Sequence, residues 1–150
     1  MNEQLSPNAS ERMKLDNQIC FAFYVCSKEI IKKYRPLLTP LGLTYTGYIT
    51  MLALWEEDNI PVKTLGDKLY LDSGTLTPLL KKLESQGFLK RSRSDIDERQ
   101  VIVSLTEEGR ELQEKAAAIP GHLIDSFEMD TEQALRMIDT LRFMMDKAPC

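Results

Sequence analysis

Residues Leu71 to Thr106, LDSGTLTPLLKKLESQGFLKRSRSDIDERQVIVSLT, are the most informative part of this chain of 150 residues about its fold. Its first half carries four leucines at three- and four-residue intervals, the spacing that lines one face of a helix. They are Leu76, Leu79, Leu80 and Leu83. Asp72 or Ser73 can cap this helix, because a short oxygen side chain accepts hydrogen bonds from the free N–H groups of the first turn. Gly87 can end it.

The second half of the stretch predicts two strands, 88–94 and 99–105, joined by a turn at 95–98. Val101, Val103 and Leu105 alternate along the second strand, as in a strand with one buried face. A helix followed by a basic hairpin is typical of a winged helix-turn-helix, which places one helix in a DNA groove. We therefore expect a mainly α fold with a small β-hairpin wing.

Helical patterns flank this unit on both sides. Before it, apolar residues predict a long helix from Leu15 to about Leu38, ended by Pro36, Pro40 and Gly42. Thr44 begins a second helix with one packed side, and Pro61 opens a short third helix. The packed side of the second helix is expected to carry Tyr48, Met51, Leu52 and Trp55.

Two further helices follow the hairpin. Thr106 can cap a helix that runs to about Ile119 and is interrupted near Pro120 and Gly121. Asp130 begins the last helix, with Gln133 as its capping-box partner. One face of this helix is apolar, with Ala134, Ile138, Leu141 and Met145.

These elements predict a single domain, 1–150, with a winged helix-turn-helix core at 44–105. The outer helices, 14–40 and 106–147, carry more apolar surface than this core can cover. We expect a second copy of the chain to cover it, so that the outer helices form a dimerisation domain. A dimer also suits double-stranded DNA, since two helices can read the half-sites of a pseudo-palindromic operator.

The distribution of charge is compatible with a nucleic-acid partner although the net charge is −4. Residues 81–99 hold six basic and four acidic side chains, whereas 106–150 hold five basic and ten acidic ones. DNA responds to the nearby patch, because salt screens charges beyond about 8 Å. No apolar run approaches the roughly 20 residues of a membrane span, and the N-terminus has no secretory pattern. We expect a cytoplasmic protein without a membrane partner.

The cysteines and the histidine give no sign of a metal or cofactor site. Cys20, Cys26 and Cys150 are three in number, so a disulfide framework is not expected. Their spacing with His122 does not match a zinc site. In a reducing compartment these residues should be free thiols, and we expect no bound metal or cofactor.

Two segments resemble the MarR family of winged-helix repressors. LDSGTLTPLLKKLE and the wing RSRSDIDERQVIVSLTEEG match its DNA-reading part, including the D-x-R of Asp97 and Arg99. LDNQICFAFYVCSKEI, KKYRPLL and LGLTYTGY are similar to the organic hydroperoxide resistance regulators and related thiol-based regulators of that family. The resemblance covers about 14–147.

This resemblance implies a dimeric repressor that releases DNA when organic hydroperoxides oxidise a cysteine. By position, Cys20 matches the sensing cysteine, and Tyr34 and Tyr45 match tyrosines that hydrogen-bond this thiol from the partner subunit. Tyr24 matches a third aromatic residue near the site. The DNA-contacting residues that the resemblance places on the recognition helix are Ser73, Gly74, Thr75, Thr77 and Pro78.

The chemistry of the thiol agrees with these roles. A thiolate attacks peroxide, and phenol O–H donors and a helix start both favour the charged form of the sulfur. Cys26 is a poor disulfide partner for Cys20, since six residues of helix rise about 9 Å and a bridge spans less than about 7 Å between Cα atoms. We expect a mixed disulfide with a low-molecular-weight thiol, and a bridge to Cys150 stays open.

The basic residues of the helix and wing suit a DNA backbone. Thr75, Thr77 and Lys81 are predicted on the outward face of the recognition helix, with Lys81 at a phosphate. Arg99 can enter the minor groove, and Arg91 and Arg93 can contact phosphates. We expect a salt bridge from Asp97 to orient Arg99.

Other functions stay open at this point. A small phenolic or aromatic ligand can act as inducer in the same family, or the chain can control a wider regulon as a thiol-based global regulator. A thiol peroxidase and a helical interaction module without DNA binding are the remaining hypotheses. The wing argues against both, and we expect no enzyme.

Overall fold

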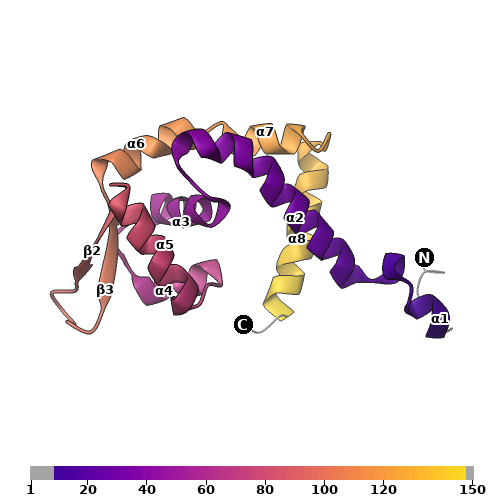
Figure 1. Ribbon diagram of the computed structural model, residues 1–150, viewed down its shortest axis with the longest axis horizontal. Helices are drawn as coiled ribbons and strands as arrows, with labels where there is room; N and C mark the ends of the chain where they lie inside the picture. The colour runs from indigo at the N-terminus through magenta and orange to yellow at the C-terminus, as the bar shows by residue number, and fades with distance from the viewer. Residues whose placement is uncertain (1–8, 148–150) are drawn as a thin grey trace.

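Residues 9–147 are described by a computed structural model, in which a winged-helix body carries two long outer helices (Figure 1). The helices are α1 (Ala9–Arg12), α2 (Ile19–Leu38), α3 (Tyr45–Glu56), α4 (Val62–Leu69), α5 (Ser73–Ser85), α6 (Glu107–Ala116), α7 (Ile119–Asp125) and α8 (Thr131–Lys147). Two 3-10 turns, η2 (Leu15–Asn17) and η3 (Thr39–Leu41), flank α2. The strands are β1 (Ile60–Pro61), β2 (Leu89–Arg93) and β3 (Val101–Leu105).

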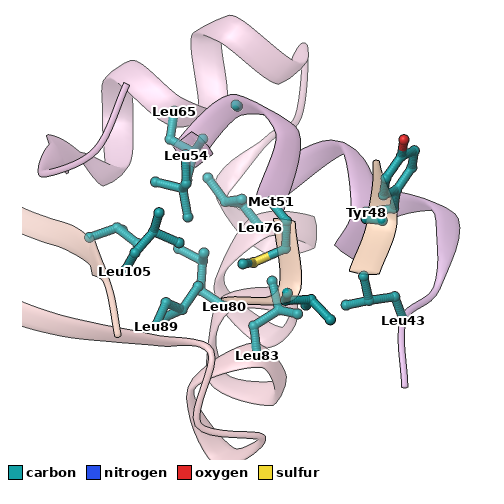
Figure 2. Close-up of a cluster of buried hydrophobic side chains, with 14 of the residues drawn as sticks. Leu43, Tyr48, Met51, Leu54, Leu65, Leu76, Leu80, Leu83, Leu89 and Leu105 are labelled. Atoms are coloured by element: carbon teal, nitrogen blue, oxygen red, sulfur yellow. The ribbon is translucent and has the colours of Figure 1, made fainter. Parts of the chain in front are cut away.

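The body is built around α3, whose apolar side chains are buried on most of its circumference. Thr44 caps this helix as predicted, because its Oγ1 accepts a hydrogen bond from the Gly47 N–H at 3.2 Å. Figure 2 shows Tyr48, Met51 and Leu54 of α3 among leucines from α4, α5 and the wing. Each fully buried side chain of this size contributes about 1.5–3 kcal/mol. Leu52 was expected on the packed side but is 41% exposed, since the core lies on the side of Met51 and Leu54.

The predicted recognition helix is α5. Asp72 is its cap, accepting a hydrogen bond from the Thr75 N–H at 2.9 Å, and Gly87 ends the segment with a left-handed φ of 81°. Leu76, Leu80 and Leu83 are fully buried against α3. The opposite face of α5 is therefore held at the surface by the packing of its leucines.

The wing contains one strand more than the sequence predicted. β2 and β3 pair as an antiparallel hairpin, with Leu89 opposite Leu105, within two residues of the predicted bounds. The additional strand, β1, pairs with the other edge of β3, so the order is β1-β3-β2. Two residues are too few for a periodic signal, which is why β1 was not predicted.

Two helix boundaries differ from those predicted. The expected helix 15–38 is divided by an extended Gln18 into η2 and α2, and Pro36 lies inside α2 two residues before its end. Pro36 removes one helical N–H, but α2 continues to Leu38, and the corner comes at Gly42, whose φ is 71°. Pro120 and Gly121 do not interrupt α6, because the break falls at 117–118 and Pro120 lies in the first turn of α7.

The outer helices α2 and α8 extend away from the body (Figure 1). The predicted capping box of α8 is confirmed, with Gln133 N–H donating to Asp130 Oδ1 at 2.7 Å and Asp130 N–H donating to Gln133 Oε1 at 3.1 Å. Many large apolar side chains on both helices are exposed. They include Ile19, Phe21, Phe23, Ile31, Leu135, Met137, Ile138, Leu141, Phe143, Met144 and Met145.

Within residues 9–147, no single helix combines the length and hydropathy that crossing a membrane requires, and only 19–41 with 45–56, bent by 71°, pass that test as a pair.

Candidate functional site

The first candidate surface is the exposed face of α5 together with the wing. Thr75, Lys81 and Pro78 of α5 are exposed, as are Ser73 and Gly74 in its first turn. Backbone hydrogen bonding from Thr75 lowers the pKa of Asp72, so the cap stays charged at neutral pH. The predicted residues therefore share one accessible face at the start of a capped helix.

A groove of about 550 Å³ lies between α4, α5 and the wing. It brings together Thr77, Arg91 and Arg99, three of the predicted residues, although Arg99 lies far from Thr77 in the sequence. Lys63 and Gln100 line the same groove and were missed by the sequence analysis. No spacing rule places Lys63 there, because its position depends on the pairing of β1 with β3.

The arginines of the wing are held in different ways. Arg91 forms an ion pair with Glu84 of α5, and its Nε and Nη2 both donate to Glu84 Oε2, at 3.0 and 2.6 Å. The hydrogen bonds from the Arg91 side chain are the main reason that the pKa of Glu84 is lowered. Arg93 donates to the Glu98 carbonyl at 2.9 Å, and the Arg99 side chain is exposed. The wing is thus tied to α5, while Arg99 extends into the groove.

The predicted salt bridge between Asp97 and Arg99 is wrong. The ion pairs of residues 9–147 do not include it, and the Asp97 carboxylate accepts instead from the backbone N–H of Arg99 at 3.0 Å. Its second oxygen lies 3.4 Å from Gln100 Nε2. The Asp97 carboxylate is thus bonded to the backbone N–H of Arg99 and not to the Arg99 guanidinium. Asp97 therefore stabilises the turn of the wing.

The second candidate site contains Cys20 and a cluster of tyrosines. Cys20 is the second residue of α2, so it lies in the first turn of that helix, and its thiol is exposed. Tyr24 is exposed one turn further, with Lys28 Nζ 5.5 Å from its ring centroid. Cys26 is also an exposed free thiol, whereas Cys150 lies outside the described residues.

Tyr34 and Tyr45 pack against each other at the far end of α2. Their ring centroids are 4.8 Å apart, and Tyr48 lies 5.7 Å from Tyr34. Burial, with smaller contributions from Tyr45 and Tyr48, raises the pKa of Tyr34 to about 12. Burial also raises the pKa of Tyr45. Both phenols are therefore protonated at neutral pH and can donate hydrogen bonds.

The structure does not bring Cys20 and these tyrosines together within one chain. The helical rise places Cys20 and Tyr34 about 21 Å apart along α2. If the phenols contact a Cys20 thiol, that thiol must belong to another copy of the chain. Among residues 9–147, no cluster of three or more histidine, cysteine or acidic side chains is arranged to hold a metal ion.

Comparison with known proteins gives consistent matches over most of the chain. The profile of a family described as "Transcriptional regulator SarA/Rot" matches residues 32–116. The organic hydroperoxide resistance transcriptional regulator of Bacillus subtilis (strain 168) is 45% identical over 139 residues, which are 93% of this chain and 95% of that protein.

Solved structures of similar proteins also match most of the length of this chain. Reduced AbfR bound to DNA matches with a TM-score of 0.75 at 34% identity, over 93% of this chain and 97% of that one. Overoxidized AbfR bound to DNA also matches with a TM-score of 0.75 at 34% identity, over 94% and 100% of the two chains. A MarR transcriptional regulator from Methanosarcina mazei Go1 matches with a TM-score of 0.69 at 25% identity, over 84% and 96%.

Proposed function

Since the chain belongs to the SarA/Rot family of transcriptional regulators and has the winged-helix fold of MarR-type regulators, we propose that it is a DNA-binding repressor that senses organic hydroperoxides through Cys20. The observation that carries this proposal is the exposed Cys20 thiol in the first turn of α2. The relatives described above are transcriptional regulators, and we propose no catalytic turnover.

The exposed apolar faces of α2 and α8 support a homodimer. Covering these faces with a second copy would remove most of the exposed large apolar side chains from water. In this proposal 14–40 and 106–147 are the dimerisation helices and 44–105 is the DNA-binding core. Two copies of α5 then face the two half-sites of a pseudo-palindromic operator.

The DNA contacts follow from the first candidate surface. Thr75 and Thr77 are short enough to approach base edges, and Lys81 suits a phosphate. We infer that Arg99 enters the minor groove and that Arg93 contacts the backbone. Arg91 is partly neutralised by Glu84, so its contribution to phosphate binding comes through the Nη1 that the pair leaves available.

The sensing reaction begins at the Cys20 thiolate. Its sulfur attacks one peroxide oxygen, so that an S–O bond forms while the O–O bond breaks and an alkoxide leaves. The sulfur is oxidised to sulfenic acid and the peroxide is reduced to an alcohol, once the alkoxide takes a proton from water. A low-molecular-weight thiol can then condense with the sulfenic acid to give a mixed disulfide and water.

Oxidation of Cys20 must then weaken the binding of the dimer to DNA. A mixed disulfide adds bulk where α2 of one copy meets the tyrosines of the other. This favours a dimer in which the two recognition helices are spaced differently from the DNA-bound form. The change is a shift of population between two arrangements, and it needs no new contact to DNA.

The test measures binding of the full chain to its own upstream DNA before and after an organic hydroperoxide, for the native protein and for Cys20→Ser. We expect the native protein to lose at least about tenfold in affinity after oxidation, a coupling of roughly 1.4 kcal/mol. Cys20→Ser should bind and not respond, and Cys26→Ser should behave as the native protein does. Equal release by Cys20→Ser would disprove Cys20 as the sensor.

A second candidate function is induction by a small aromatic anion. The groove lined by Thr77, Arg91 and Val101 favours it, since it offers a cation and an apolar wall between α5 and the wing. In the same assay, a phenolic carboxylate would then release Cys20→Ser and the native protein equally. A ligand without effect on either protein leaves the thiol as the trigger.

A further inference from the structure

A second pocket, of about 330 Å³, lies beside Tyr45 where the end of α2 meets the start of α3. Part of its lining is apolar, from Ile31, Leu38 and Leu43. The polar part includes Arg35 and Tyr45. The pocket thus brings an exposed basic residue close to a tyrosine whose pKa is raised by burial, next to a partly apolar lining.

Arg35 is the positive charge of this lining, and it has no partner within residues 9–147. The ion pairs and side-chain hydrogen bonds of this part of the chain do not involve its guanidinium. The two threonine hydroxyls of the pocket are already used, since Thr39 Oγ1 donates to the Arg35 carbonyl at 2.7 Å and Thr44 Oγ1 caps α3. No carboxylate lines the pocket, so Arg35 is an exposed basic residue of the lining without an acidic partner there.

We propose that Arg35 is a further residue of the thiol site, where its guanidinium stabilises the thiolate of Cys20 from a second copy of the chain. This inference rests on the proposed function. The phenols of Tyr34 and Tyr45 can donate neutral hydrogen bonds to a sulfur, whereas Arg35 adds a full positive charge. An opposite charge within about 6 Å is among the strongest influences on a thiol's ionisation.

The titratable groups that face the sulfur in this arrangement come from both copies. The pocket side contributes Arg35 and Tyr34 from α2 and Tyr45 from α3. The side of Cys20 contributes Tyr24, one turn further along α2, with Lys28 Nζ 5.5 Å from its ring centroid, and Asp16 in the preceding η2 turn. Arg35 is the cation of the pocket side, so its removal should lower the fraction of thiolate.

The test follows alkylation of Cys20 by iodoacetamide against pH, in the full-length dimer, with the Cys20 peptide quantified by mass spectrometry. We expect Arg35→Gln to react about threefold to tenfold more slowly at pH 7, with its profile moved to higher pH. Arg35→Lys should restore most of the rate. Lys32→Gln removes a charge from the same helix outside the pocket lining and should match the native protein.

The possible outcomes distinguish a failure of the role of Arg35 from a failure of the proposed function. An Arg35→Gln profile that coincides with the native one overturns the role of Arg35 and leaves the proposed function intact. An Arg35→Lys variant that is folded but as slow as Arg35→Gln also overturns it, because the charge would not be the cause. A native profile equal to that of free cysteine removes the activated thiol, and with it both proposals.

Discussion

Gly109 is the residue at which the wing and α6 approach most closely. A Cβ atom built on it would lie 1.9 Å from the Phe88 carbonyl oxygen, which is too short for any real contact. Around it, Gly109 N–H donates to Thr106 Oγ1 at 3.0 Å and its carbonyl accepts from Trp55 Nε1 at 2.8 Å. The absence of a side chain at this position therefore lets α6 lie directly against Phe88, the residue before β2, while Trp55 of α3 bonds to the Gly109 carbonyl.

Replacing Gly109 by alanine should destabilise the chain. We expect a loss of about 1–3 kcal/mol in the free energy of unfolding, since backbone must move to admit one methyl group. Gly121→Ala is the matched control, because a Cβ at Gly121 meets nothing within 4 Å. Urea unfolding followed by circular dichroism compares the two variants. Equal stability of both would show that the approach of Phe88 to α6 is not a constraint.

At the scale of elements, Asp58 joins the loop after α3 to the wing and to α6. Its carboxylate accepts from the Leu105 N–H at 2.8 Å and from Arg110 Nη2 at 2.8 Å. Burial alone would raise the pKa of Asp58, but hydrogen bonds from Leu105, Arg110 and Asn59 outweigh it and lower the pKa. The charged carboxylate thus connects the start of α6 to the end of β3.

This connection predicts a dependence of stability on pH. The folded chain holds the charged form of Asp58 more strongly than the unfolded chain does, so the contribution is present above the ordinary pKa of about 3.9 and lost as pH falls through the lowered pKa. Asp58→Asn should cost about 1–3 kcal/mol at pH 7 and less in acid. Urea unfolding at both pH values, with Asp125→Asn as control, measures this. A cost that is unchanged in acid would contradict it.

At the scale of the whole molecule, the winged-helix body has its own core, whereas α2 and α8 have not. The buried residues come from the end of α2 through Ile119, and α8 contributes none of them. Leu141 lies midway along the exposed apolar face of α8. The body should therefore fold whether or not a second copy covers the outer helices.

A charge on the face of α8 should separate dimer formation from folding. We expect Leu141→Glu to raise the dimer dissociation constant by at least about tenfold, since the carboxylate would be buried without a partner. Asp139→Lys changes a charge on the opposite side of the helix and should leave the dimer intact. Sedimentation gives the mass and circular dichroism the fold. A dimer that tolerates Leu141→Glu would place the interface elsewhere.

The residue pattern alone was enough to predict the winged-helix fold, the caps at Thr106 and Asp130, and the family, because these depend on local spacing and on short motifs. It left the cap of α5 open between Asp72 and Ser73. The resemblance to MarR-type and organic hydroperoxide resistance regulators is confirmed by the matches over most of the chain. The buried face of a helix was predicted correctly where apolar residues recur with the helical period, as for Leu76, Leu80 and Leu83. The roles assigned to Cys20 and Arg99 stay predictions.

Contacts between residues far apart in the sequence could not be predicted and are seen in the folded chain alone. Folding paired β1 with β3, placed Lys63 beside Arg99, bound Arg91 to Glu84, and turned Asp97 to a backbone N–H instead of the Arg99 side chain. It also packed Tyr34 against Tyr45 and placed Arg35 in the lining of the pocket beside Tyr45. Such contacts follow from the packing of several elements at once, and no pattern along one segment contains that information.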